Sequence, residues 1–275
     1  MNAVRTLAGV IGLALLLSAV PLGLHAQGAP GLVTQDAATR ELAQIRSLRA
    51  QLGQTPRAAE PQRWASAQAA LAAALAARGE RLGDVALLEQ AADAYGEALQ
   101  VTTRARAPDE WAMMMAQRGR VLRLRGDRLG GIEGRSAQAE AVASLREALD
   151  ATSRDHAPLT WAATQAELGL AFMGLTEAGP GTEPLEAAVA AHRLALEVRM
   201  RERARREQAM SQMQLGLALA ALGERTGSPA LLAEALDNFE PGLAFLAPIW
   251  PHSERVRARV QRERIRRALR TLSPP

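Results

Sequence analysis

Apolar residues recur along this chain with the spacing of helices rather than alternating from one position to the next. Leu168, Phe172 and Leu175 fall on one face of a helix that begins near Trp161, because steps of three to four residues return to the same side. A shorter stripe follows, in which an alanine, a larger side chain and a leucine are spaced four residues apart. The pattern predicts an all-α chain built from pairs of helices.

The stripes repeat at a nearly constant interval. Three of the four repeats have a tryptophan three residues after a proline. In all four repeats a small residue follows the tryptophan position by eight residues, and these small residues are spaced by 47, 50 and 47 positions. The tryptophans are Trp64, Trp111 and Trp161, with Gln208 in the fourth copy, and the small residues are Ala72, Gly119, Gly169 and Gly216. Self-similarity at a fixed period is typical of repeat proteins.

The second stripe has the same period. Its alanines are Ala91, Ala141, Ala188 and Ala235, with Gln44 in the first copy. Its larger side chains are Leu48, Tyr95, Leu145, His192 and Phe239, and its leucines are Leu52, Leu99, Leu149, Leu196 and Leu243. Two landmarks with one period indicate a repeated unit of two helices, which we call helix A and helix B.

These units predict a right-handed α-solenoid of antiparallel helical hairpins, with about ten helices over residues 34–272. Proline in a first turn starts helix A, and Gly79, Gly126 and Gly223 are expected to end it in the left-handed conformation. The expected parts are a half-repeat at 34–54, repeats at 61–107, 108–157, 158–204 and 205–251, and a basic capping helix at 252–272.

Two places depart from the regular spacing. The Gly-rich stretch Gly130–Gly134 lengthens the second repeat, and we expect a longer turn there. The stretch 197–212 has no glycine or proline, so either a tight turn near Arg205–Glu207 or a nearly continuous helix is expected.

The repeat resembles the tetratricopeptide repeat family, whose units carry Leu-Gly, an aromatic three residues on, and later an alanine followed four residues on by a large side chain. The matching residues are Leu168-Gly169, Phe172 and Ala188 with His192, then Leu215-Gly216, Leu219 and Ala235 with Phe239, then Leu71-Ala72, Leu75 and Ala91 with Tyr95.

This chain departs from that family in two ways. The usual period of 34 residues is stretched to about 47, as in an extended variant of bacterial type, and the tryptophan lies four residues before the family's aromatic position. Gln68, Met115, Gln165 and Gln212 occupy that position. The resemblance implies a protein- or peptide-binding scaffold, and it does not indicate which partner binds.

The N-terminus predicts export. Arg5 precedes a nearly unbroken apolar run from Leu7 to Val20, and Ala26 offers a small residue for cleavage. This three-part pattern is typical of a signal peptide at residues 1–26, followed by a short linker at 27–33. An uncleaved segment that anchors the chain in the inner membrane is the alternative, because about 18–20 apolar residues can span a bilayer.

Composition narrows the environment. The chain has 275 residues, no cysteine and a net charge of +4, and all 33 basic residues are arginine. An exported chain without disulfides is stabilised by core packing alone, which fits a periplasm in the cell envelope.

We find no set of residues that would make an enzyme. Of the four histidines, His192 takes a core position, His156 and His252 lie beside prolines, and no pair has metal-ligand spacing. There is no phosphate loop and no nucleophile elbow. The sequence therefore predicts a non-enzyme without a cofactor, a metal or a nucleic-acid partner.

Two candidate binding surfaces remain. Gln68, Gln165 and Gln212 recur on helix A, where they either form structural hydrogen bonds or line a groove for a peptide. The segment Ser253–Leu272 carries eight arginines against two glutamates, so its net charge is +6 while the rest of the mature chain is about −3.

The basic segment has two interpretations. Arg255, Arg259, Arg262 and Arg266 could contact an anionic membrane or an acidic partner, whereas a solvated cap is the alternative. The expected function is an exported scaffold or adaptor that binds a protein or peptide in the bacterial cell envelope. The alternative is an accessory envelope subunit that docks through its C-terminal helix.

Overall fold

The computed structural model describes residues 30–178 and 181–273, and α-helices form nearly all of this part of the chain. The predicted signal peptide and the first residues of the linker, 27–29, lie outside the described residues. The helices are α2 (Pro30–Gln54), α3 (Pro61–Leu82), α4 (Val85–Leu99), α5 (Pro108–Leu129), α6 (Gly131–Ala151), α7 (Pro158–Gly174), α8 (Glu183–Arg201), α9 (Arg205–Thr226), α10 (Pro229–Leu246) and α11 (His252–Leu272). Short 3-10 turns follow α7 (Leu175–Ala178) and α10 (Ala247–Ile249).

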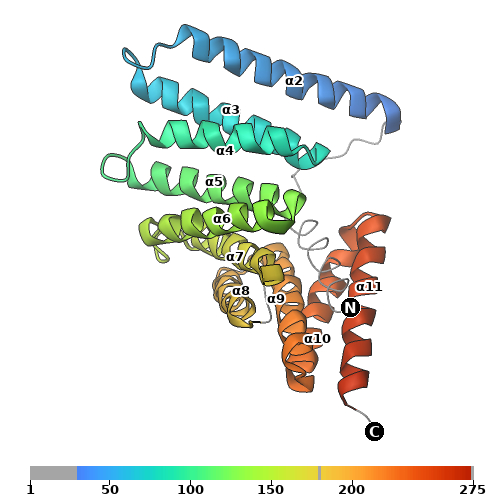
Figure 1. The fold of residues 1–275 in the computed structure, drawn as a ribbon. Helices are drawn as coiled ribbons and strands as arrows, with labels where there is room; N and C mark the ends of the chain where they lie inside the picture. The colour runs from blue at the N-terminus through green and yellow to red at the C-terminus, as the bar shows by residue number, and fades with distance from the viewer. Residues whose placement is uncertain (1–29, 179–180, 274–275) are drawn as a thin grey trace.

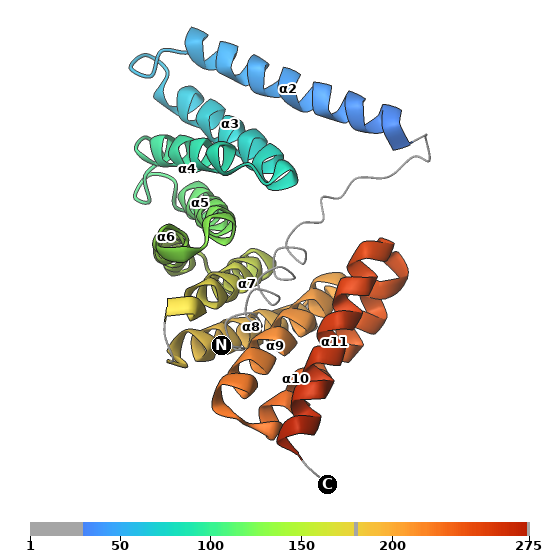
Figure 2. The same cartoon turned by 45° about the vertical axis from the view of Figure 1, so that its right-hand side comes forward.

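The ten helices of the described residues pack mainly against their neighbours in the chain. Each helix contacts the next one from α2 to α11. The first helices of successive repeats also touch: α3 contacts α5, α5 contacts α7, and α7 contacts α9. Figure 1 shows the resulting stack, with α2 at one end and α11 at the other. In Figure 2 the stack curves, so that α9 to α11 turn away from the direction of α2 to α5.

The alanine positions of helix B form the centre of each hairpin. Ala91, Ala141, Ala188 and Ala235 are all completely buried. The equivalent Gln44 of α2 is exposed. Among the described helices, α2 packs mainly against α3 and reaches α4 through the hydrogen bond between Arg49 and Gln90. With fewer described neighbours to pack against, this copy tolerates a polar side chain at the alanine position.

The small residues of helix A mark the closest approach within each hairpin. A Cβ added at Gly119 would lie 2.6 Å from a side-chain carbon of Leu145, and one at Gly216 would lie 2.7 Å from the carbonyl oxygen of Ala235. Helix B of each repeat therefore sits directly on this position of helix A, and larger residues there would force the two helices apart.

The expectation for the ends of helix A is wrong by one turn. Gly79, Gly126 and Gly223 lie inside their helices, where an added Cβ would meet the next helix at 2.8 to 3.1 Å. The left-handed glycines lie four residues later in each case, at Gly83, Gly130 and Gly227. The earlier glycines serve close packing, and the later ones end the helix.

Of two further expectations about connections, the first is wrong and the second is confirmed for one of its two alternatives, the tight turn. The stretch Gly130–Gly134 is not a long turn, because α6 begins at Gly131 and Gly134 packs on the carbonyl oxygen of Gly126. Between α8 and α9 there is a tight turn, but it lies at residues 202–204, where Arg203 takes a left-handed φ of 57°. In addition, α2 begins at Pro30, so residues 30–33 of the predicted linker are helical.

Candidate functional site

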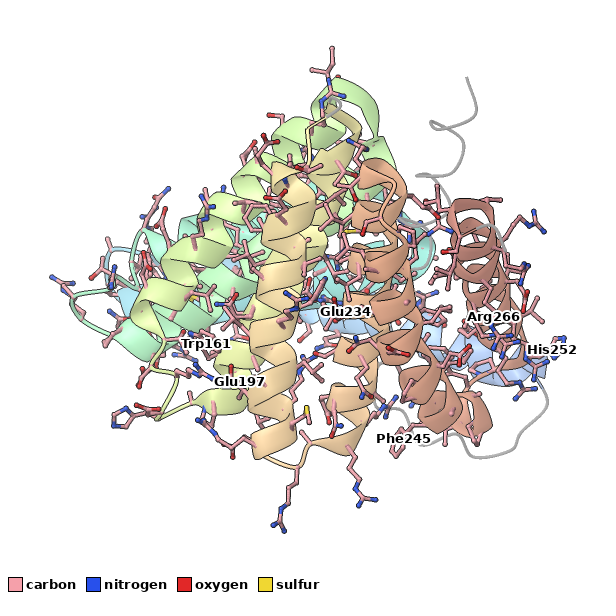
Figure 3. The ribbon with its side chains drawn as sticks, turned by 90° about the horizontal axis from the view of Figure 1, so that it is seen from below. Trp161, Glu197, Glu234, Phe245, His252 and Arg266 are labelled. Carbon is pink, nitrogen blue, oxygen red and sulfur yellow. The ribbon has the colours of Figure 1, made fainter. Side chains whose placement is uncertain are left out.

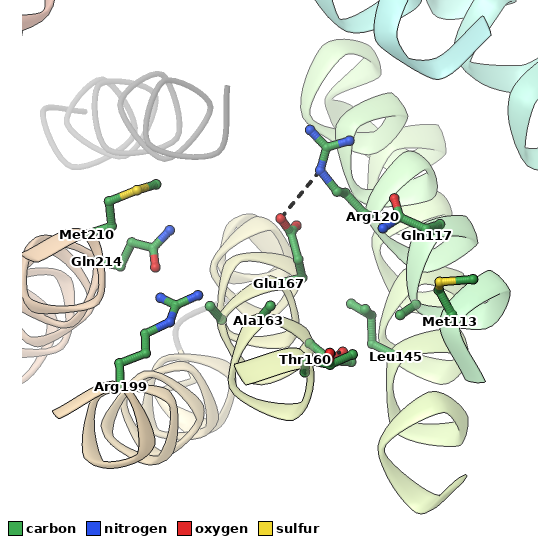
Figure 4. Close-up of a pocket in the computed structure, with 13 residues that line it drawn as sticks. Met113, Gln117, Arg120, Leu145, Thr160, Ala163, Glu167, Arg199, Met210 and Gln214 are labelled. Atoms are coloured by element: carbon green, nitrogen blue, oxygen red, sulfur yellow. Dashed lines mark hydrogen bonds and ion pairs between the residues drawn. The ribbon is translucent and has the colours of Figure 1, made fainter. Parts of the chain in front are cut away.

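A pocket of about 280 Å³ lies on the side of the stack where the first helices of repeats 2, 3 and 4 meet. Its walls come mainly from α5, α7 and α9, with one residue each from α6 and α8 (Figure 4). No residue of α10 or α11 lines it.

The pocket follows the repeat. Met113 and Met210 stand at the same place in α5 and α9, two residues after the tryptophan position, and Ala163 takes that place in α7. Four residues further on, the three helices contribute Gln117, Glu167 and Gln214. Each first helix therefore adds one apolar and one polar side chain, so the wall alternates in a way that suits an extended ligand with both kinds of group.

A buried ionic network holds this wall together. The Arg123 guanidinium is completely buried and donates from Nε to Glu167 (2.7 Å) and from Nη1 to Asp127 (2.6 Å). Arg120 lies 3.6 Å from Glu167 and also pairs with Glu80 of α3, so the network joins three successive repeats. Its polarity is unexpected, because carboxylates on helical repeats usually face solvent.

Burial and charge act differently on the two acids. Burial raises the pKa of Asp127 to about 6, and the attraction of Arg123 only partly offsets it. Burial also acts to raise the pKa of Glu167, but Arg123 and Arg120 together outweigh it, so that pKa is lowered. Glu167 is thus the ionised partner of the arginines at neutral pH and gives the pocket little uncompensated negative charge.

Arg199 differs from the network arginines. It lines the pocket from α8, is only 8 % exposed, and donates from Nη1 to Ser211 Oγ (2.6 Å) and to the carbonyl oxygen of Glu207 (3.2 Å). Among the described residues no carboxylate lies within ion-pair distance of it. Burial lowers the pKa of Arg199, and the attraction of Glu207 and Glu167 only partly offsets this effect.

Two more polar groups near Arg199 have no hydrogen-bond partner in the described chain. The side-chain oxygen of Gln214, a pocket residue, is buried without a hydrogen-bond partner. Both ring nitrogens of the fully buried His192 also lack a hydrogen-bond partner. Burial and the nearby Arg199 lower the pKa of His192 to about 3, so it is neutral and fills the core position expected for it.

The three glutamines singled out from the sequence lie elsewhere. Gln68 is buried and donates to Glu97 of helix B in its own hairpin, and Gln212 lies against Gly242 of α10. Gln165 is buried as well, and none of the three lines the pocket. Their shared position, four residues after the tryptophan position, is on the side of helix A that faces helix B. The position two residues later, which holds Gln117, Glu167 and Gln214, faces the pocket.

The arginines singled out in the C-terminal helix are placed unequally. Arg255 donates to the Trp250 carbonyl oxygen (2.9 Å), Arg262 lies 3.7 Å from Glu263, and Arg266 pairs with both Glu240 (2.6 Å) and Glu263 (3.2 Å). Arg259 is exposed and has no ion pair or hydrogen bond within the described residues. Arg255 and Arg266 thus contribute to holding α11 in place, whereas Arg262 pairs within α11 itself.

A repeated arginine–tryptophan contact escaped the sequence analysis. Arg57, Arg104 and Arg154 lie over the rings of Trp64, Trp111 and Trp161 at 4.8, 5.8 and 5.1 Å. Each arginine also donates a hydrogen bond to a residue near the end of the next helix B. Arg154, for example, donates to Glu197, which lies beside Trp161 (Figure 3). The sequence does contain a signal for this contact, because an arginine stands seven residues before each of the three tryptophans.

The described residues contain neither a candidate metal site nor a candidate membrane span, and the chain matches no known family or curated protein. In residues 30–178 and 181–273 no group of three histidine, aspartate or glutamate side chains could hold a metal ion. No helix in this same part of the chain is long and apolar enough to cross a bilayer. No protein-family model matches the chain, and no curated protein is similar enough to count as a relative.

Proposed function

We propose that this chain is an exported scaffold or adaptor of the bacterial cell envelope, a right-handed tetratricopeptide-like solenoid that binds a segment of another protein. The pocket on α5, α7 and α9 is the binding site. It is a non-enzymatic surface that recognises its partner by shape and charge. Contacts between the first helices of successive repeats support the solenoid, because such contacts align equivalent side chains along one wall.

The observation that carries the proposal is Arg199, a buried guanidinium that lines the pocket and forms no direct ion pair, since Glu167 of the same pocket pairs with Arg123 and Arg120 instead. A buried charge is costly unless it is paired, and Gln214 adds an unpartnered polar oxygen at the same place. A ligand carboxylate offers the missing pair. Met113 and Met210 provide adaptable apolar contact, so the preferred segment combines an acidic side chain with apolar neighbours.

A pair of equally exposed methionines provides the test. Met113 lies in the pocket and is 54 % exposed, whereas Met200 of α8 is 55 % exposed and lies outside it. The protein is used to isolate partners from the envelope fraction, and the bound segment is then measured as a synthetic peptide. Met113→Glu lowers the affinity at least about tenfold by repelling a ligand carboxylate, while Met200→Glu leaves it unchanged.

Two results would refute the proposal. One is that no specific partner is recovered. The other is that Met113→Glu and Met200→Glu bind the segment equally well, since the pocket would then not be the site. Circular dichroism of both variants shows whether the fold is kept, and both substitutions are at exposed positions that leave the core unchanged.

A further inference from the structure

The outer face of α11 corresponds to the face of α3, α5, α7 and α9 that is covered by helix B in each of the four hairpins. Counted from the start of each first helix, Val256 corresponds to Ala65, Ala112, Ala162 and Ala209, which are all buried. Val260 corresponds to Met213, which is completely buried, yet Val256 and Val260 are 42 % and 60 % exposed. No helix of the described residues covers this face of α11.

The bare face is apolar along its middle and basic at its edges. Val256 and Val260 line a groove of about 520 Å³ together with Arg259, Arg264 and Arg267. Among the described residues, the exposed Arg257, Arg259, Arg267 and Arg270 form no ion pair or hydrogen bond. Glu263, the one acid beside the groove, is already paired with Arg262 and Arg266.

A closely packed partner helix does not fit this face. Helix B approaches its partner over glycines, as at Gly216 and Gly223 of α9, and the equivalent positions of α11 are Glu263 and Arg270. Side chains of that size hold a second helix away from the aliphatic residues.

A second copy of the chain does not fit either. At the other end of the described stack lies α2, a helix B with no helix A before it in the described residues, which would be the natural complement. However, α2 carries three arginines against two acids, and one of these acids, Glu41, is engaged by Arg78 and Arg81. Two basic helices repel each other, so stacking of copies end to end is disfavoured.

We propose that this face docks on an anionic lipid surface. A bilayer interface needs no close approach of backbones. Arginine guanidinium groups pair with lipid phosphates, while the aliphatic stems and the two valines lie at the boundary of the acyl chains. The inference is independent of the pocket on α5, α7 and α9, because it uses another helix and another face.

Vesicle binding tests the proposal on the chain that begins at Gln27, which keeps every described helix. Vesicles of phosphatidylcholine alone are compared with vesicles in which about a third of the lipid is phosphatidylglycerol. The chain binds only the anionic vesicles, and binding is lost between about 0.1 M and about 1 M salt because the charges are screened. Arg259→Gln with Arg267→Gln lowers partitioning about 25-fold, since each arginine contributes about fivefold.

Matched variants identify the face. Arg46→Gln with Arg106→Gln removes the same charge from exposed positions on α2 and on the turn after α4, and partitioning changes less than about twofold. Val256→Ser with Val260→Ser lowers partitioning about fivefold. Circular dichroism checks that each variant is folded, and the full chain is measured in parallel.

Several outcomes would overturn the proposal. Equal binding to both kinds of vesicle, or equal loss in both arginine pairs, would show that the arginines of α11 have no special role. No change on replacing the valines would remove this face as the contact. Poly-glutamate binding as tightly as the vesicles, with the same sensitivity to Arg259 and Arg267, would indicate an acidic protein partner instead. Self-association abolished by those substitutions would indicate a second copy.

Discussion

The second and fourth hairpins have the same backbone plan but fill one core position in opposite ways. Arg123 of α5 and Ala220 of α9 stand at the same place in their helices, and both are completely buried. Arg123 is surrounded by Asp127 and Glu167, whereas Ala220 lies in a helix whose buried residues are almost all apolar. The hairpin geometry therefore tolerates either an ionic or an apolar filling, and the ionic one lies beside the pocket.

The largest effect is expected from breaking the ionic filling. Arg123→Ala leaves Asp127 without an arginine and Glu167 with only the more distant Arg120, and it opens a cavity, so we expect the free energy of unfolding to fall by about 3–5 kcal/mol. Urea unfolding measures this. Replacing Arg123, Asp127 and Glu167 together by Met, Leu and Gln should restore most of the loss, because buried ion pairs add little net stability. A loss below about 1 kcal/mol for Arg123→Ala would contradict this account.

A second difference between the hairpins concerns pH. His192 and Phe239 occupy the same place in helix B, but only His192 can titrate. The pKa of His192 is about 3 in the folded protein against 6.5 as its ordinary value, so the unfolded chain takes up a proton first as pH falls. Between pH 7 and pH 5 the wild-type protein therefore loses about 2 kcal/mol of unfolding free energy at this residue, and we expect His192→Leu to abolish that loss.

Asp127 acts in the opposite direction in the same pH range. Its pKa is raised to about 6, so the folded protein takes up this proton before the unfolded chain and gains stability as pH falls from about 6 towards 4. The comparison must therefore be made between wild type and His192→Leu in urea at each pH, since Asp127 is common to both. Parallel pH profiles of the two proteins would contradict the assignment to His192.

The smallest effect is expected in the turns between repeats. Arg154 lies over the ring of Trp161, whereas the equivalent Arg201 has Gln208 in place of the tryptophan and pairs only with Glu202. We expect Arg154→Gln to lower the unfolding free energy by about 0.5–1 kcal/mol and Arg201→Gln to have almost no effect. Thermal unfolding of the two variants measures the difference, and equal values would show that the stacked ring adds nothing.

Positions that follow the repeat could be predicted, and positions that depend on neighbouring repeats could not. Ala188 and Ala235 are buried as their spacing requires, because helix B has one face towards helix A. The ends of the helices were misplaced because a glycine has two uses. Gly126 and Gly130 look alike in a sequence, yet one permits close packing and the other takes a left-handed φ.

The candidate site was harder to predict than the fold. The sequence analysis chose Gln68, Gln165 and Gln212, whose shared register is conspicuous, but that register faces helix B. Arg123 and Glu167 are 44 residues apart and belong to different repeats. Their pairing depends on how one hairpin sits on the next, which the spacing within a repeat does not specify.

The contacts between chain neighbours have a consequence for folding. Helices that contact strongly are never more than two apart in the order of the described chain, so few loops must close over long stretches before native contacts form. Folding can therefore begin in any adjacent pair and spread outward. Among the described helices, α2 has few contacts beyond those with α3, so it is expected to open first and to exchange its amide hydrogens fastest.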